Sequence, residues 1–139
     1  MTRTDEGDRH DVAAPGRRAL LGAGLAAGLL ALTGSNIARA QVGGDDALLE
    51  YAMRLELTAR DLYDAAVDAG GLEDLARVLR NQHEAYAQSL SRVTGLSARG
   101  RLDDVYDALV GSFAVSDDTA VAAAGQQLES VAVATHTEL

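Results

Sequence analysis

Residues 46–69 read DALLEYAMRLELTARDLYDAAVDA and carry the clearest structural signal in the chain. Apolar side chains recur in it at steps of four and three, which keeps them on one face of a helix. The stretch contains no proline, and Gly70-Gly71 follows it as a stop signal. It therefore predicts a long helix over residues 46–69 with Asp45 as its N-cap. The expected buried stripe is Leu48, Ala52, Leu55, Ala59, Leu62 and Ala66.

Further helices are expected on the C-terminal side of this one. Residues 72–94 repeat the spacing and stop at Gly95, a short helix is expected over 102–110, and the last helix follows Ser116 and runs to residue 139. Asp117 and Asp118 suit the positive end of its dipole. The expected stripes are Leu72, Ala76, Leu79, His83, Tyr86, Leu90 and Val93, and then, more weakly patterned, Val121, Ala124, Leu128, Val131 and Thr135.

Short connections make successive helices antiparallel. The sequence thus predicts an all-α fold, an antiparallel up-down helical bundle with three long helices, a short extra helix and the fourth long helix missing. The last residues, 135–139, carry no glycine, proline or cap. Two explanations stay open: the domain is C-terminally incomplete, or a partner chain completes the core, as a homo-oligomer formed through the last helix.

Residues 1–40 have the features of an export signal. A polar opening leads into Arg17-Arg18, an apolar run follows over residues 19–32, and the segment ends in Ala38-Arg39-Ala40. The pair resembles a twin-arginine (Tat) signal, and Ala38 and Ala40 form a small-x-small cleavage site. The expected mature domain is therefore residues 41–139, in a periplasmic, cell-wall-associated or extracellular location. An uncleaved N-terminal anchor remains the alternative, although the run is shorter than the roughly 20 residues of a membrane span.

Composition excludes several classes of function. The chain has 12 basic and 21 acidic residues; five and four of these lie in residues 1–40, so 7 and 17 remain and the mature net charge is about −10. Such a charge disfavours nucleic acid and anionic membranes as partners. The absence of cysteine excludes disulfides, thiolate metal sites and a lipoprotein anchor. No phosphate-binding loop and no nucleophile motif is present.

Polar residues on the expected inward stripes are the candidates for chemistry, since an unpaired charge is costly to bury. Glu56 lies among small residues of the first helix, His83 interrupts the apolar stripe of the second, and Glu129 lies among small residues of the last. His136 shares the stripe of Glu129 but is expected to be exposed near a frayed end.

A resemblance to a known family rests on three segments: LEYAMRLE (49–56) continuing to Leu62-Tyr63, NQHEAYAQSL (81–90) and QLES (127–130). They resemble the first three helices of ferritin-like domain proteins, in particular the exported bacterial branch related to desiccation-associated ferritin-like proteins. The resemblance implies a di-metal site built from two Glu and two Glu-x-x-His motifs. Glu56 and Glu129 match the two carboxylates, but His83 and Tyr86 stand where the second helix should supply Glu and His.

What remains of that site is a ligand set of Glu56, His83 and Glu129, which would suit iron, manganese or zinc. Tyr63 and Tyr86 would orient the carboxylates by hydrogen bonds. The alternative is that Glu56 and His83 are a hydrogen-bonded part of the core, and that Glu129 lies at a solvent-facing edge.

The sequence favours a non-catalytic exported bundle with a degenerate metal site, acting in stress protection or as a binding or structural module. The alternative is an extracytoplasmic metal-binding or oxidoreductase protein.

Overall fold

The computed structural model describes residues 44–137, which contain four helices and no strand. The all-helical prediction is therefore confirmed. The predicted signal peptide and the last two residues of the chain lie outside the described residues. The helices are α2 (Asp45–Ala69), α3 (Glu73–Thr94), α4 (Asp103–Phe113) and α5 (Asp118–Thr137).

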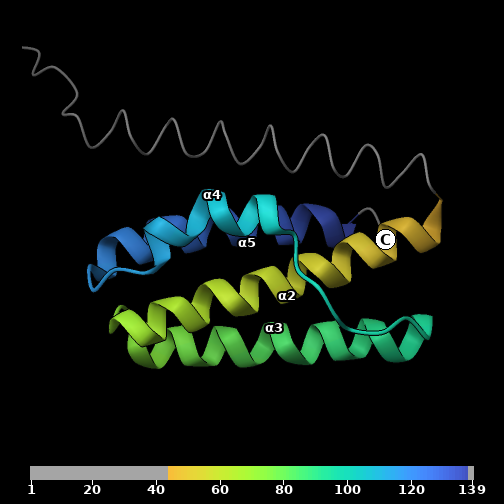
Figure 1. Ribbon diagram of the computed structural model, residues 1–139, viewed down its shortest axis with the longest axis horizontal. Helices are drawn as coiled ribbons and strands as arrows, with labels where there is room; N and C mark the ends of the chain where they lie inside the picture. The colour runs from red at the N-terminus through yellow and green to blue at the C-terminus, as the bar shows by residue number, and fades with distance from the viewer. Residues whose placement is uncertain (1–43, 138–139) are drawn as a thin grey trace, which may run out of the picture.

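The helices form two layers, α2 with α3 and α4 with α5, as Figure 1 shows. Successive helices run in opposite directions. Ion pairs from Arg60 to Glu84 and from Arg80 to Asp64, both at 2.8 Å, join α2 to α3 in antiparallel register. Among the described helices, the backbone of α2 lies close to those of all three others, whereas the backbone of α3 lies close only to that of α2.

The helix ends agree with the sequence to within about a residue except at the start of α2 and at the end of α4, which continues to Phe113 instead of stopping at Val110. Gly70 and Gly95 end α2 and α3 in the left-handed conformation. Asp117 caps α5, because its Oδ1 accepts hydrogen bonds from the backbone N–H groups of residues 119 and 120. The predicted Asp45 cap is wrong: Gly44 is the N-cap, at φ 86°. Asp45 is already helical, so its carboxylate acts only through the helix dipole.

The core confirms two of the three predicted stripes. Every stripe residue of α2 and of α5 is buried. The α3 stripe is wrong at two positions, because Tyr86 and Val93 are exposed while Ala87 is buried instead. The physical reason is that α3 packs against a single helix, so only a narrow line of its side chains, with Ala76, His83 and Ala87 fully buried, is covered.

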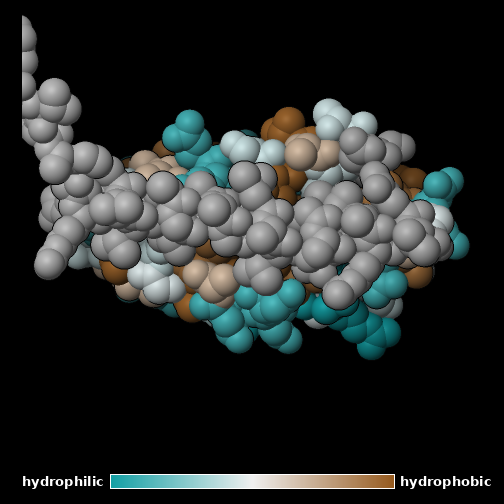
Figure 2. Space-filling model, turned by 90° about the horizontal axis from the view of Figure 1, so that it is seen from above, coloured by the Kyte–Doolittle hydropathy of each residue, from teal (hydrophilic) through white to brown (hydrophobic). Residues whose placement is uncertain are grey.

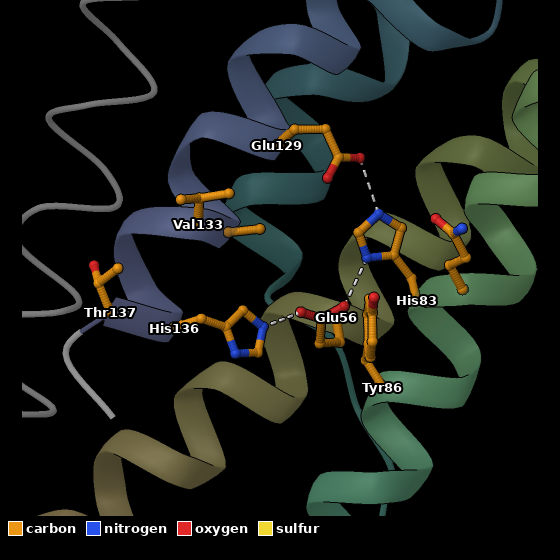
Figure 3. Close-up of a pocket in the computed structure, with 9 residues that line it drawn as sticks. Glu56, His83, Tyr86, Glu129, Val133, His136 and Thr137 are labelled. Atoms are coloured by element: carbon orange, nitrogen blue, oxygen red, sulfur yellow. Dashed lines mark hydrogen bonds and ion pairs between the residues drawn. The ribbon is translucent and has the colours of Figure 1, made fainter.

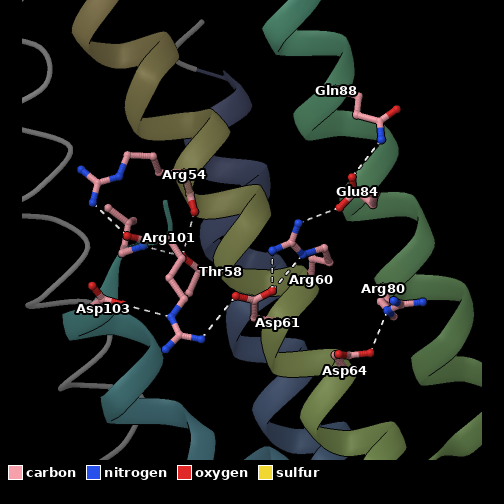
Figure 4. Close-up of polar contacts among 11 residues, drawn as sticks. Arg54, Thr58, Arg60, Asp61, Asp64, Arg80, Glu84, Gln88, Arg101 and Asp103 are labelled. Carbon is pink, nitrogen blue, oxygen red and sulfur yellow. Dashed lines mark hydrogen bonds and ion pairs between the residues drawn. The ribbon is translucent and has the colours of Figure 1, made fainter. Parts of the chain in front are cut away.

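Polar contacts hold the segment that connects α3 to α4 against α2 (Figure 4). The Arg54 guanidinium donates to the backbone carbonyl of Arg101 at 2.8 Å, and the backbone N–H of Leu102 donates to the Thr58 hydroxyl at 2.9 Å. The Arg101 guanidinium lies 3.4 Å above the centre of the Tyr106 ring. These contacts hold the start of α4 over the middle of α2.

The surface of the described residues is mixed in polarity. Brown, hydrophobic atoms reach the surface beside teal, hydrophilic ones in Figure 2. None of the described helices combines the length and the apolar composition that a membrane-spanning helix needs.

The loop between α2 and α3 gives a test of the packing. A Cβ atom on Gly71 would lie 2.4 Å from the carbonyl oxygen of Val115 and 2.9 Å from a methyl group of Val121. We expect Gly71→Ala to lower the free energy of unfolding by about 1–3 kcal/mol, because backbone must move to admit the methyl group. Urea denaturation measures the change.

Gly111, in the last turn of α4, is the matched control, since a Cβ atom there meets nothing within 4 Å. Gly111→Ala should raise stability by about 0.5–1 kcal/mol through helix propensity. Equal effects of the two substitutions would contradict the close approach at Gly71.

Candidate functional site

A solvent-open groove lies between α3 and α5, with α2 as its floor (Figure 3). Its volume is about 490 Å³. The groove exists because the α3 and α5 backbones make no contact, although both pack on α2. The residues that line it are Glu56, Gln82, His83, Tyr86, Glu129, Ala132, Val133, His136 and Thr137.

Glu56 is the charged group at the bottom of the groove, and its side chain is only 2% exposed. It comes from the middle of α2, where the neighbouring turns place Ala52 and Ala59 on the same face. Its Oε2 lies 2.6 Å from Nδ1 of His83, and its Oε1 lies 2.5 Å from Nε2 of His136. One carboxylate on α2 thus links both walls of the groove.

His83 lies between two carboxylates. Its Nδ1 contacts Glu56, and its Nε2 lies 3.1 Å from Oε1 of Glu129. Burial alone would lower the pKa of His83, but the hydrogen bonds to Glu129 and Glu56 outweigh it and raise the pKa from 6.5 to about 9. At neutral pH the ring is therefore an imidazolium that donates both N–H groups.

Tyr63 completes this chain of contacts. Its hydroxyl donates to Oε1 of Glu129 at 2.8 Å, and its ring is stacked on His83 with 5.6 Å between the centroids. Burial, followed by the charge of Glu129, raises the pKa of Tyr63, so the phenol stays protonated and acts as a donor. Burial opposes the charge on Glu129, but the bonds from His83 and Tyr63 lower its pKa overall. Gly125 leaves room for the contact, since a Cβ atom there would lie 2.9 Å from the Tyr63 hydroxyl.

The structure brings together the three predicted ligands Glu56, His83 and Glu129, and it places Tyr63 as a hydrogen-bond donor to one of them. Tyr86 lines the groove, but its hydroxyl bonds to none of the carboxylates of the described residues; its ring lies 6.4 Å from that of His136. Sequence reasoning left His136 out of the ligand set. Its side chain is 39% exposed, as expected, yet it bonds to Glu56. Its place two turns after Glu129, on the same stripe, was the available signal.

The donor chemistry suits a divalent metal ion, but the arrangement is that of a hydrogen-bonded chain. Bonds of about 2.0–2.2 Å to zinc hold neighbouring ligand atoms roughly 3 Å or more apart. The two contacts of Glu56 are shorter, at 2.5 and 2.6 Å, so these atoms are placed as direct hydrogen-bond partners. Within residues 44–137 no three His, Asp or Glu side chains converge as ligands on one point.

The raised pKa of His83 predicts a pH dependence of stability. A group whose pKa is higher in the folded state stabilises the fold fully below its unfolded pKa, here about 6.5, and loses that contribution as the pH rises through about 9. We expect the free energy of unfolding to fall by about 2–3 kcal/mol across this interval. Denaturation at a series of pH values measures it.

His83→Gln is the control for this pH dependence, because the amide occupies similar space and has no proton to lose in the interval. The variant should be less stable at pH 6.5 and should show little slope between pH 6.5 and 9. A slope equal to that of the parent protein would assign the effect to other groups.

No protein-family model, curated protein or solved structure matches the chain, so these comparisons assign no family to it.

Proposed function

We propose that the protein is an exported, ferritin-like helical bundle that acts as a non-catalytic binding or structural module. In this proposal the metal site of the ferritin-like fold has been replaced by a network of hydrogen bonds. The observation that carries it is the pairing of the buried groups. Both oxygens of Glu56 and both nitrogens of His83 have partners within the chain.

The pairing supports a structural role because a buried carboxylate and a buried imidazolium are stable only when each is neutralised and hydrogen-bonded. His83 replaces the Glu of the expected Glu-x-x-His motif. This exchange turns a pair of carboxylates that would need a cation into a carboxylate and imidazolium that neutralise each other. The network would then fix α3 and α5 on α2 and keep the groove open between them.

A second candidate is a site for iron, manganese or zinc, and the position of His136 favours it. Two imidazoles and two carboxylates from three helices line one groove, and this donor set is one that such ions accept. Glu56, His83, Glu129 and His136 would hold the ion after their side chains moved from the present chain of hydrogen bonds to converge on it, and the ion would take the place of the hydrogen-bonding protons. The ion would supply Lewis-acid or redox chemistry when bound, and Tyr63 would hold Glu129 in position.

Metal analysis of the protein isolated from its exported location distinguishes the two candidates. Iron, manganese and zinc well below one ion per chain support the structural network. About one ion per chain in the parent protein, lost in Glu56→Gln, would support the metal site instead and reject the first proposal.

His83→Ala tests the structural role directly. Removing the imidazole leaves one oxygen of a buried carboxylate without its partner, so we expect the free energy of unfolding to fall by about 3 kcal/mol or more. Gln82→Ala is the matched control: it lines the same groove from an exposed position and should change stability by about 0.5 kcal/mol or less. Similar losses in both variants would remove the support for the network.

Export by the twin-arginine pathway is part of the proposal and lies in residues outside the described structure. Replacing Arg17 and Arg18 together by Lys should leave the uncleaved chain inside the cell, whereas Arg9→Lys should not. Fractionation followed by mass spectrometry measures this, and the exported form should begin at Gln41. Unchanged export of the double variant would argue against a twin-arginine leader.

A further inference from the structure

Helix α3 carries a second apolar stripe that nothing within residues 44–137 covers. Leu75 and Val78 are each 51% exposed, Tyr86 is 53% exposed and Val93 is 83% exposed. These four positions, with Gln82 and Ser89 between them, follow one another at steps of three and four residues and so lie along one side of the helix. The stripe is separate from the buried line of α3 that faces α2.

The stripe borders the groove. Gln82 and Tyr86 belong to both, and on the opposite wall Val133 of α5 is 63% exposed. Helices α3 and α5 both run antiparallel to α2 and therefore parallel to each other, as Figure 1 shows. The corner between them is where an up-down bundle accommodates a helix antiparallel to both neighbours.

The positions of the charged residues along α3 indicate which helix could fit into this corner between α3 and α5. The helix begins with acidic residues, including Asp74, and has Arg92 in its last turn. Between these two positions the stripe and its outer flank, Asn81 and Ala85, are uncharged. If α3 meets a second α3 in antiparallel orientation with Asp74 of each copy opposite Arg92 of the other, Leu75 of one copy lies within a turn of Val93 of the other.

The chain has a net charge of −9, so two copies repel each other over most of their surface. The uncharged stripe of α3 is therefore a surface on which two copies can approach. The Asp74–Arg92 pair occurs twice by symmetry, and the helix dipoles oppose each other favourably.

We propose that the exposed stripe of α3 is a self-association surface. On it, α3 of a second copy lies antiparallel and fills the corner between α3 and α5. Each copy thereby supplies the fourth helix of the other's bundle, and Tyr86 becomes buried.

Sedimentation velocity of the exported protein over a range of concentrations tests this surface. The parent protein should have the mass of a dimer, and Val93→Glu should weaken association at least about tenfold, because it places a carboxylate in the apolar seam. Ala108→Glu, at an exposed position of α4, is the matched control and should leave the dimer intact. Circular dichroism confirms that each variant is folded.

A charge exchange tests the antiparallel orientation. Asp74→Arg and Arg92→Asp should each weaken the dimer, and the double variant should restore it, since the pairs are then reversed. A role of these residues in helix stability alone would make the double variant worse than either single one. Three results would each overturn the proposal: a parent protein that is monomeric at every concentration, a dimer that Val93→Glu does not weaken, or a double variant that does not restore association. A monomeric parent protein would leave the corner between α3 and α5 to a different helix.

Discussion

A buried carboxylate is the constraint on which the arrangement of this bundle depends. Glu56 lies at the centre of α2 with its side chain 2% exposed, where an unpaired charge would cost several kcal/mol. Its two oxygens are satisfied by imidazoles from two other helices, His83 of α3 and His136 of α5. Because each oxygen needs its own donor, the rotation and register of both helices relative to α2 are fixed by one residue.

The same constraint explains why a groove lies where a bundle would have packed side chains. Helices α3 and α5 are held on α2 by polar contacts near its centre, and their backbones do not touch. Arg101, held by Arg54 and stacked on Tyr106, places the start of α4 against α2, and α4 also packs against α5. Among residues 44–137, apolar side chains fill the space between α2, α4 and α5, whereas the stripe of α3 that carries Leu75, Val78, Tyr86 and Val93 is exposed.

The residues of the groove can be explained as a structural hydrogen-bond network or as a metal site, and the two explanations require different protonation states. His83 as an imidazolium hydrogen-bonds to both carboxylates and offsets one of their two negative charges, whereas a metal ion would need the imidazole to be deprotonated and the ligand atoms to move apart. The proposed self-association has a separate basis, the exposed side chains of α3, and would close the groove against solvent whether or not an ion is bound.

Local signals in the sequence, namely periodicity, glycine stops and the absence of proline, were enough to predict the helices and most of the core. The α2 stripe and the three polar residues Glu56, His83 and Glu129 could be predicted in this way, whereas the cap formed by Asp117 was seen only in the structure. Features that depend on how many helices pack around a residue could be seen only in the tertiary structure. Tyr86 and Val93 fit an inward helical pattern but are exposed, since only one helix packs on α3. His136 looks like part of a frayed end, yet it bonds to Glu56, because the antiparallel packing of α5 on α2 brings residues 80 positions apart into contact.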